Sequence, residues 1–142
     1  MKGGPIPAFS IFSAVSEILV TAGVLFIMRR NWTRRTFSLA AFLAVALFEA
    51  CVNVLYMASR AAEAAGGAHP IAGGMRLFFA LHGLLSLLAY LAFVILGVFA
   101  YQDQRAGRFF FRDRPALTAS FLVVWLVSVT SGEVLFALRY LI

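Results

Sequence analysis

The chain has 142 residues, of which 63% are hydrophobic and 13% are charged. Soluble domains are nearer half apolar and a quarter charged, so this composition excludes an ordinary soluble domain and predicts an integral membrane protein. The net charge is +6, but the arginines form short clusters between long apolar runs, as membrane topology signals do, and nucleic acid is not expected as a partner.

Four apolar runs are long enough to cross a bilayer as helices, which takes about 20 residues each. They cover residues 8–28, 36–59, 76–101 and 116–140. Barrel strands would be shorter and would alternate polar and apolar residues, and a backbone in lipid must satisfy its own hydrogen bonds. The predicted fold class is therefore all-α, a polytopic membrane protein in which residues 1–142 form a single four-transmembrane-helix bundle. Pro115 is expected in the first turn of the last helix.

The connections at 29–35, 60–74 and 102–115 differ in charge. The first and third hold eight of the twelve basic residues: Arg29, Arg30, Arg34, Arg35, Arg105, Arg108, Arg112 and Arg114. This asymmetry places both connections in the cytoplasm and both termini outside, in a bacterial cytoplasmic (inner) membrane. Binding of anionic lipid headgroups is the alternative interpretation of the clusters. Interfacial aromatic side chains are expected at Trp32, Tyr101, 109–111 and Tyr140.

Each predicted helix carries one ionisable group within its apolar run. These groups are Glu17, Glu49, His82 and Glu133. Such residues are costly in lipid, usually face the bundle interior and mark candidate functional sites. Counted from the outer helix ends at 1.5 Å per residue, all four fall in the outer half of the membrane. Neighbours three or four positions away give each helix one polar side. The sequence thus predicts a polar pocket near the outer face, supported by Asn53, Ser86, Tyr90 and Thr130.

Four interpretations of this pocket remain open. The first is a structural polar core, in which protonated glutamates hydrogen-bond across helices. The second is a metal site in which Glu17, Glu49, His82 and Glu133 hold iron, zinc or copper, as carboxylates and histidines do in other four-helix bundles. The chain lacks the Glu-x-x-His pairs of the di-iron sites. The third is a proton or quinone site, and the fourth is a contact with a partner subunit.

Other chemistries find little support in the sequence. A membrane haem normally takes two histidines within spans, and His69 lies beside Pro70 in the outer loop, so haem is not expected. The motifs of serine hydrolases, zinc proteases and P-loop enzymes are absent, which favours a non-catalytic protein. The single cysteine, Cys51, lies in an apolar run and is expected to pack in the core.

Two stretches in the second half of the chain, "LHGLLSLLAYLAFVILG" and "WLVSVTSGEVLFALRYL", are distinctive. They resemble a small bacterial four-helix membrane family of unknown function that tends to accompany cytochrome c oxidase and its assembly genes. His82 matches the histidine near the start of that family's third helix. Trp125, Val129, Thr130 and Gly132 match a Trp…Val-Thr-Gly pattern in its last helix, and "LFIMRRN" is similar to its basic first connection.

The resemblance implies a four-helix architecture and an energy-transducing membrane. The leading expectation is an accessory subunit or assembly factor of a bacterial respiratory, cytochrome oxidase-type complex, with other membrane subunits or a second copy as partners. The alternatives are a membrane protein that binds a metal ion or small ligand in the pocket, and a quinone- or haem-linked redox subunit. The family's further histidines are missing from "NWTRRTF", "VLYMASR" and "FFFRDRP", and the intramembrane glutamates are not carried over from it.

Overall fold

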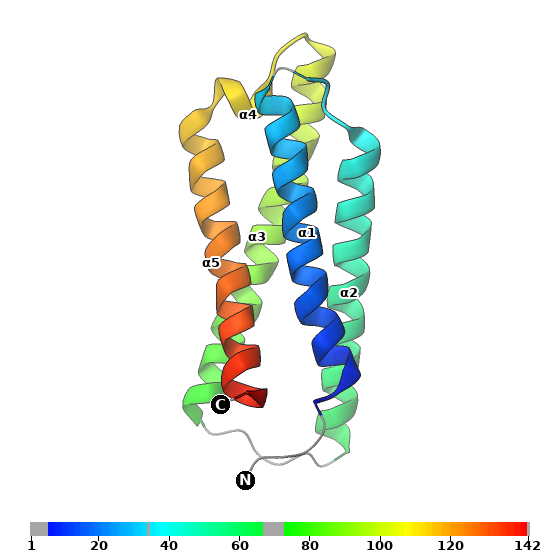
Figure 1. Ribbon diagram of the computed structural model, residues 1–142, viewed down its shortest axis with the longest axis vertical. Coiled ribbons are helices and arrows are strands. Elements are labelled where there is room, and N and C mark those ends of the chain that lie inside the picture. The colour runs from blue at the N-terminus through cyan, green and yellow to red at the C-terminus, as the bar shows by residue number, and fades with distance from the viewer. Residues whose placement is uncertain (1–5, 34, 67–72, 142) are drawn as a thin grey trace.

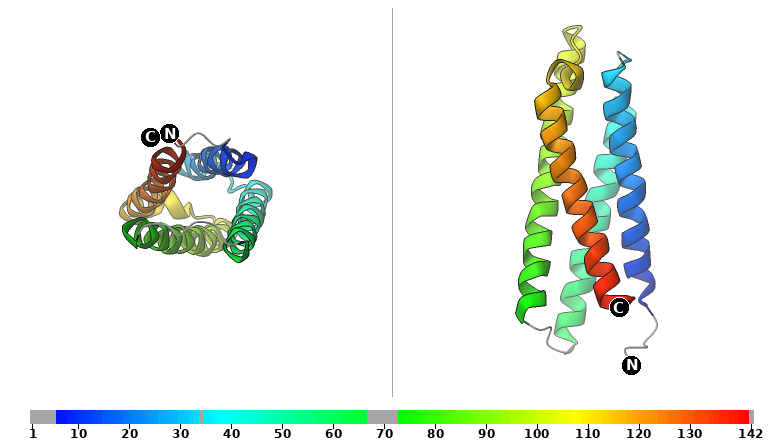
Figure 2. Two further views of the ribbon diagram at one scale, coloured as in Figure 1. Left: turned by 90° about the horizontal axis from the view of Figure 1, so that it is seen from below. Right: turned by 60° about the vertical axis from the view of Figure 1, so that its left-hand side comes forward.

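A computed structural model describes residues 6–33, 35–66 and 73–141 of the chain. The helices are α1 (Ala8–Trp32), α2 (Leu39–Ala65), α3 (Gly73–Arg105), α4 (Phe110–Asp113) and α5 (Pro115–Tyr140). The four long helices run alternately up and down and form the sides of a square, in the order α1, α2, α3, α5 (Figures 1 and 2). We call the end where α1 begins and α5 ends the terminus end. The opposite end, where α1 ends and α5 begins, is the basic end.

All four long helices are long and apolar enough to cross a membrane. Their outward faces are covered by large apolar side chains, such as Leu47, Val54 and Met57 of α2, which are 65–69% exposed. Exposure of such a surface to water would be unfavourable, whereas lipid tails solvate it well. The all-α four-helix bundle and its bilayer environment are therefore confirmed.

The helices are longer than the apolar runs from which they were predicted. Helix α3 has 33 residues, which is about 50 Å at 1.5 Å per residue, whereas the hydrocarbon layer is about 30 Å thick. Its last turn, as far as Arg105, is polar and continues the helix beyond the apolar thickness. The length of an apolar run predicts the part of a helix that lies in the membrane. Because the helix backbone also satisfies its hydrogen bonds outside the membrane, a polar segment can extend the same helix into water. Pro115 starts α5 as predicted.

The basic end is closed by the short helix α4, which the sequence did not reveal. The fully buried Asn31 at the end of α1 accepts a hydrogen bond through Oδ1 from the backbone N–H of Phe111, at 3.0 Å. Thr118 Oγ1 donates to the carbonyl of the same Phe111 at 2.7 Å. Phe110 and Phe111 are 5% and 2% exposed. These two phenylalanines lie at the end of the bundle, where interfacial aromatic side chains were predicted, and α4 folds back so that both rings seal the core.

The core of the basic half is aromatic. Phe42, Phe93, Phe121 and Trp125 are each at most 5% exposed and touch one another, and we call these four residues the aromatic plug. Gly97 of α3 makes room for it, since a Cβ there would collide with the ring of Phe42 on α2. The polar groups that the sequence singled out all lie on the terminus side of this plug.

Cys51 does not pack in the core, so that prediction is wrong. Among the side chains of α2 that the structure describes, Phe42, Ala46 and Val52 are buried, and Cys51 lies on the exposed side of the helix. The apolar run gave no clue to this, because a span in lipid is apolar on its outward face as well as on its inward face.

Candidate functional site

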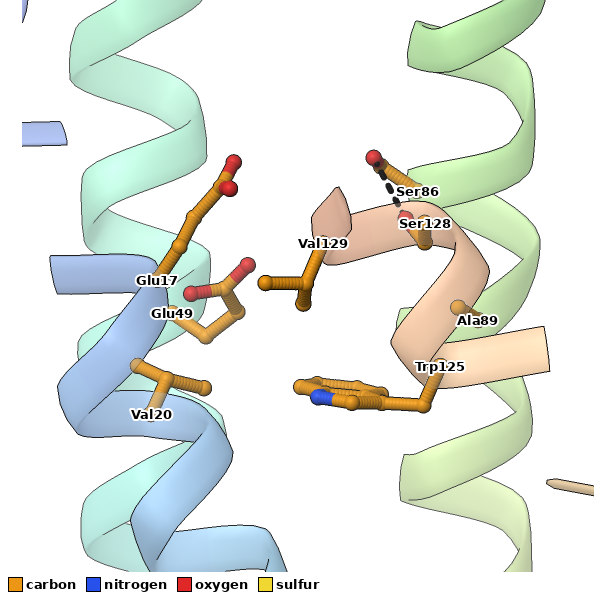
Figure 3. A pocket seen from close by; sticks show the side chains of 8 residues that line it. All are labelled: Glu17, Val20, Glu49, Ser86, Ala89, Trp125, Ser128 and Val129. Carbon is orange, nitrogen blue, oxygen red and sulfur yellow. Dashed lines mark hydrogen bonds between the residues drawn. The ribbon is translucent and has the colours of Figure 1, made fainter. Parts of the chain in front are cut away.

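A small cavity lies inside the bundle on the terminus side of Trp125. All four long helices contribute to its walls, which are lined by Glu17, Val20, Glu49, Ser86, Ala89, Trp125, Ser128 and Val129 (Figure 3). The space open to the centre of a water molecule is about 20 Å³, which is room for about one water. A haem or a quinone ring does not fit in a space of this size.

Two carboxyl groups reach this cavity from neighbouring helices. Glu17 of α1 and Glu49 of α2 both point inward above Val20 and Trp125 (Figure 3), and both residues are half-buried. Glu17 and Glu49 line the same cavity, and Glu133 is the chain neighbour of Gly132, which Glu17 also approaches. The structure therefore brings two of the predicted intramembrane glutamates into one cavity and places the third next to a residue that Glu17 contacts.

A chain of hydrogen-bonded serines connects the cavity to His82. Ser86 Oγ of α3 and Ser128 Oγ of α5 are 2.8 Å apart (Figure 3). One turn further along α5, Ser131 Oγ donates to the carbonyl of Ser128 at 2.7 Å and lies 2.8 Å from His82 Nδ1. A hydroxyl group has one proton, so Ser131 accepts from an Nδ1–H of His82. This network assigns the Nδ1–H tautomer and leaves a lone pair on Nε2.

Gly132 allows Glu17 and His82 to approach each other. A Cβ on this glycine would lie 2.8 Å from Oε2 and 3.1 Å from Oε1 of Glu17, and 2.9 Å from Cε1 of His82. The carboxyl group and the imidazole edge thus converge on the same point, which only a residue without a side chain leaves open. Gly132 was noted in the sequence for a family pattern, and its structural role was not predicted.

Glu49 is held by its own helix. Asn53 Nδ2 donates to Glu49 Oε1 at 2.9 Å and to the Glu49 carbonyl at 3.0 Å. Asn53 itself is exposed on the outer surface of α2, so it supports the pocket from outside and does not line it. Tyr90 donates its hydroxyl proton to the carbonyl of Ala46 at 3.0 Å, which joins α3 to α2 one turn below the cavity.

The predicted residues of α5 do not all face inward. Glu133 is half-buried, and its Oε1 is buried without a hydrogen-bond partner among the described residues. Thr130 is exposed, in a shallow outer groove that Phe78 and Leu126 also line. The polar side of α5 predicted from Thr130 and Glu133 is not the side that faces the bundle interior. The inward face contains Phe121, Trp125 and Ser128.

The metal hypothesis gains no support from this geometry. Within the described residues, no three His, Cys, Asp or Glu side chains are placed so that they could hold one metal ion. His82 is turned toward Ser131, and Glu49 is bonded to Asn53. His69, which would have to be the second histidine ligand of a haem, lies outside the described residues together with Pro70.

Trp125, Ser128 and Ser131 are site residues that sequence reasoning missed. Trp125 Nε1 donates to Thr21 Oγ1 at 3.0 Å and so ties α5 to α1 at the base of the cavity. A signal was present, because 121, 125, 128 and 132 follow the three- and four-residue spacing of one helix face. Serine is too small and common in membrane helices for such spacing to be decisive without the neighbouring helices.

Comparisons with known proteins give no relative for this chain. No protein-family model matches it, and no curated protein or solved structure is significantly similar.

Proposed function

We propose that this protein is a non-catalytic membrane subunit, an accessory subunit or assembly factor of a bacterial respiratory complex of the cytochrome oxidase type. The respiratory setting rests on the resemblance of the His82 and Trp125–Gly132 segments to the small four-helix family. The need for a partner rests on Asn53, which is exposed among lipid-facing residues of α2. Its Nδ2 donates to Glu49, whereas its Oδ1 has no partner among the described residues. An unsatisfied amide oxygen in lipid is costly, and helix–helix contacts are where such groups are usually satisfied.

The same proposal includes an orientation in the bacterial cytoplasmic membrane. The first and third connections, with their arginines, meet at the basic end (Figure 1). The positive-inside rule then puts the basic end in the cytoplasm and the terminus end outside. In this orientation the cavity with Glu17 and Glu49 lies on the outer side of the aromatic plug.

Purification from native membranes in a mild detergent tests the partner role. We expect larger subunits to co-purify with a tagged chain, and we expect these subunits to show the visible absorption spectrum of haem. Replacing Asn53 with Leu should weaken that association several-fold, because the hydrogen-bonding group at the interface is lost. Cys51→Leu, a change on the same exposed face without loss of an amide, is the matched control and should retain the partners. A chain that runs alone, or that recovers haem subunits equally well with Asn53→Leu, would contradict the proposal.

A second candidate function is the binding of a small ligand in the pocket. The cavity with its two carboxyl and two hydroxyl groups favours it. Its size supports a water molecule or a proton as the occupant more than a larger ligand.

A further inference from the structure

The terminus half of the bundle holds several polar groups in its interior. Glu17 of α1 and His82 of α3 both approach Gly132 of α5, Glu133 is the next residue on α5, and Glu17 also lines the cavity together with Glu49; we call these groups the polar row. Nearer the terminus end, the guanidinium groups of Arg60 (α2) and Arg139 (α5) flank the ring of Phe79, at 5.7 and 5.8 Å. Tyr56 of α2 and Tyr140 of α5 lie against these two guanidinium groups, at 5.2 and 5.3 Å, and Tyr90 of α3 donates to the carbonyl of Ala46.

This row can carry exchangeable protons. Carboxyl, imidazole, hydroxyl and water groups donate and accept in turn, whereas apolar side chains do neither. The serine chain fixes the Nδ1 proton of His82 and leaves Nε2 as an acceptor. Glu17 Oε2 and His82 Cε1 lie 2.8 and 2.9 Å from the same point, the Cβ position of Gly132, and no direct hydrogen bond joins the two side chains in the described part of the chain. The cavity beside Glu17 has room for one water, which can connect the carboxyl group to its polar neighbours.

The row stops at the aromatic plug. Phe93 lies in ring contact with Trp125, Phe121 and Phe42, at 5.7, 6.4 and 5.2 Å between ring centres. Below them, Val24 and Ile27 of α1 are 0% and 1% exposed. The single exchangeable proton of the plug, on the indole nitrogen of Trp125, is already donated to Thr21. On the basic side of the plug, the buried core cluster of the described residues is apolar as far as the polar Asn31 and Thr118 at the basic end.

We infer that the interior of this bundle is a dead-end proton well, which takes up a proton from the terminus end and does not pass it to the basic end. The proton comes from water at the terminus end and forms an O–H bond on the Glu17 carboxylate. A water molecule that accepts this proton and donates one of its own relays it to His82, which breaks the O–H bond on Glu17, forms an N–H bond at Nε2, and leaves a carboxylate and an imidazolium. It returns to water by the reverse steps, so no oxidant or other reactant is consumed. The well is a property of the isolated chain and does not depend on the proposed partner complex.

Infrared spectroscopy of the protein in lipid vesicles tests the uptake and its sidedness. The orientation of the chain is read from external protease cleavage of a C-terminal tag. After an external pH step, we expect the carbonyl band of a protonated carboxyl group to change at once in vesicles with the tag outside. In vesicles with the tag inside, it should change only after an ionophore equilibrates the pH. An immediate response in the second population would overturn the inference.

Variants assign the signal to the row. Glu17→Gln should abolish the part of the band that responds to pH, and His82→Gln should remove its coupling to the imidazole bands. Thr130→Val, which changes an outward-facing hydroxyl on α5, is the matched control and should leave the signal unchanged. If Glu17→Gln does not fold, Gly132→Ala is the second variant, because its Cβ displaces the Glu17 carboxyl group and should shift the band. A band that survives these changes unaltered contradicts the assignment.

A flux measurement separates a well from a channel. Vesicles with a pH-sensitive dye inside and a potassium diffusion potential should acidify no faster with the protein than without it. Acidification that depends on the protein and is lost in Glu17→Gln would show that protons cross the plug, and the dead-end inference would fall. A missing respiratory partner would affect neither this measurement nor the infrared signal.

Discussion

Gly132 of α5 faces Glu17 of α1 and His82 of α3 with no side chain of its own. Any larger residue would compete for the point at which the carboxyl group and the imidazole edge meet. The interfering atoms include the far end of a flexible glutamate, which can turn aside, so the expected damage is local. Gly83 is the useful comparison, because a Cβ there would meet nothing within 4 Å.

We expect Gly132→Ala to lower the free energy of unfolding by about 1–3 kcal/mol, the usual cost of overpacking a filled interior. Gly83→Ala should be neutral or stabilising by about 0.5–1 kcal/mol, because alanine restricts the unfolded chain more than glycine does. Unfolding of both variants in mixed detergent micelles measures the difference. Equal stability of the two variants would mean that Glu17 and His82 do not meet at Gly132.

At the scale of the elements, the turn between α3 and α4 is organised by one carboxylate. Asp103 Oδ1 accepts from Arg108 and Oδ2 from Arg114, both at 2.7 Å. Its backbone carbonyl accepts from the N–H groups of Ala106 and Arg108, and Gly107 takes the left-handed φ of 74° that reverses the chain. Arginines that the sequence presented as topology signals are therefore also structural partners.

Asp103→Asn should destabilise this turn by about 1–2 kcal/mol, because two charge-assisted hydrogen bonds to exposed arginines are weakened. Hydrogen exchange should rise over residues 103–114 while the transmembrane helices stay protected. Asp113→Asn is the matched control for loss of charge, because Asp113 is exposed and an asparagine there keeps an oxygen that can accept the hydrogen bond from the Phe109 N–H. Exchange that rises equally in both variants would contradict the role given to Asp103.

At the scale of the whole molecule, the bundle has two unlike halves. The basic half is sealed by α4 and filled by the aromatic plug, whereas the terminus half holds the cavity and the ionisable groups. An asymmetry of this kind has functional meaning only if the two ends face different compartments. The orientation of the chain is therefore a central experimental question.

Cysteine labelling in intact cells measures that orientation. In a Cys51→Ala background, Gly66→Cys at the terminus end should react with a membrane-impermeant maleimide added outside. Ala106→Cys at the basic end should react only after the cells are opened. Both positions are exposed, so accessibility of the side chain is matched. Labelling of Ala106→Cys in intact cells would reverse the orientation.

The four spans could be predicted from the sequence because lipid imposes a simple condition, about 20 apolar residues with self-satisfied backbones. The ionisable groups could be found for the same reason, since Glu17, Glu49, His82 and Glu133 are conspicuous in apolar runs. The side of each helix that faces the bundle interior could not be predicted from the sequence, because the lipid-facing and core-facing residues of a span are both apolar. Hence Thr130, Asn53 and Cys51 were assigned to the interior although they face outward.

The sequence by itself determined how many helices cross the membrane and which residues are out of place in lipid. Only the tertiary structure decided that Ser86, Ser128 and Ser131 connect those residues, that Gly132 admits Glu17 to His82, and that aromatic rings close the path. The physical reason is the distance along the sequence between the residues that interact. Crossing a bilayer depends on local composition, whereas the cavity and the polar row depend on contacts between side chains from four helices that are distant in the sequence, such as Trp125 and Thr21, which are 104 residues apart.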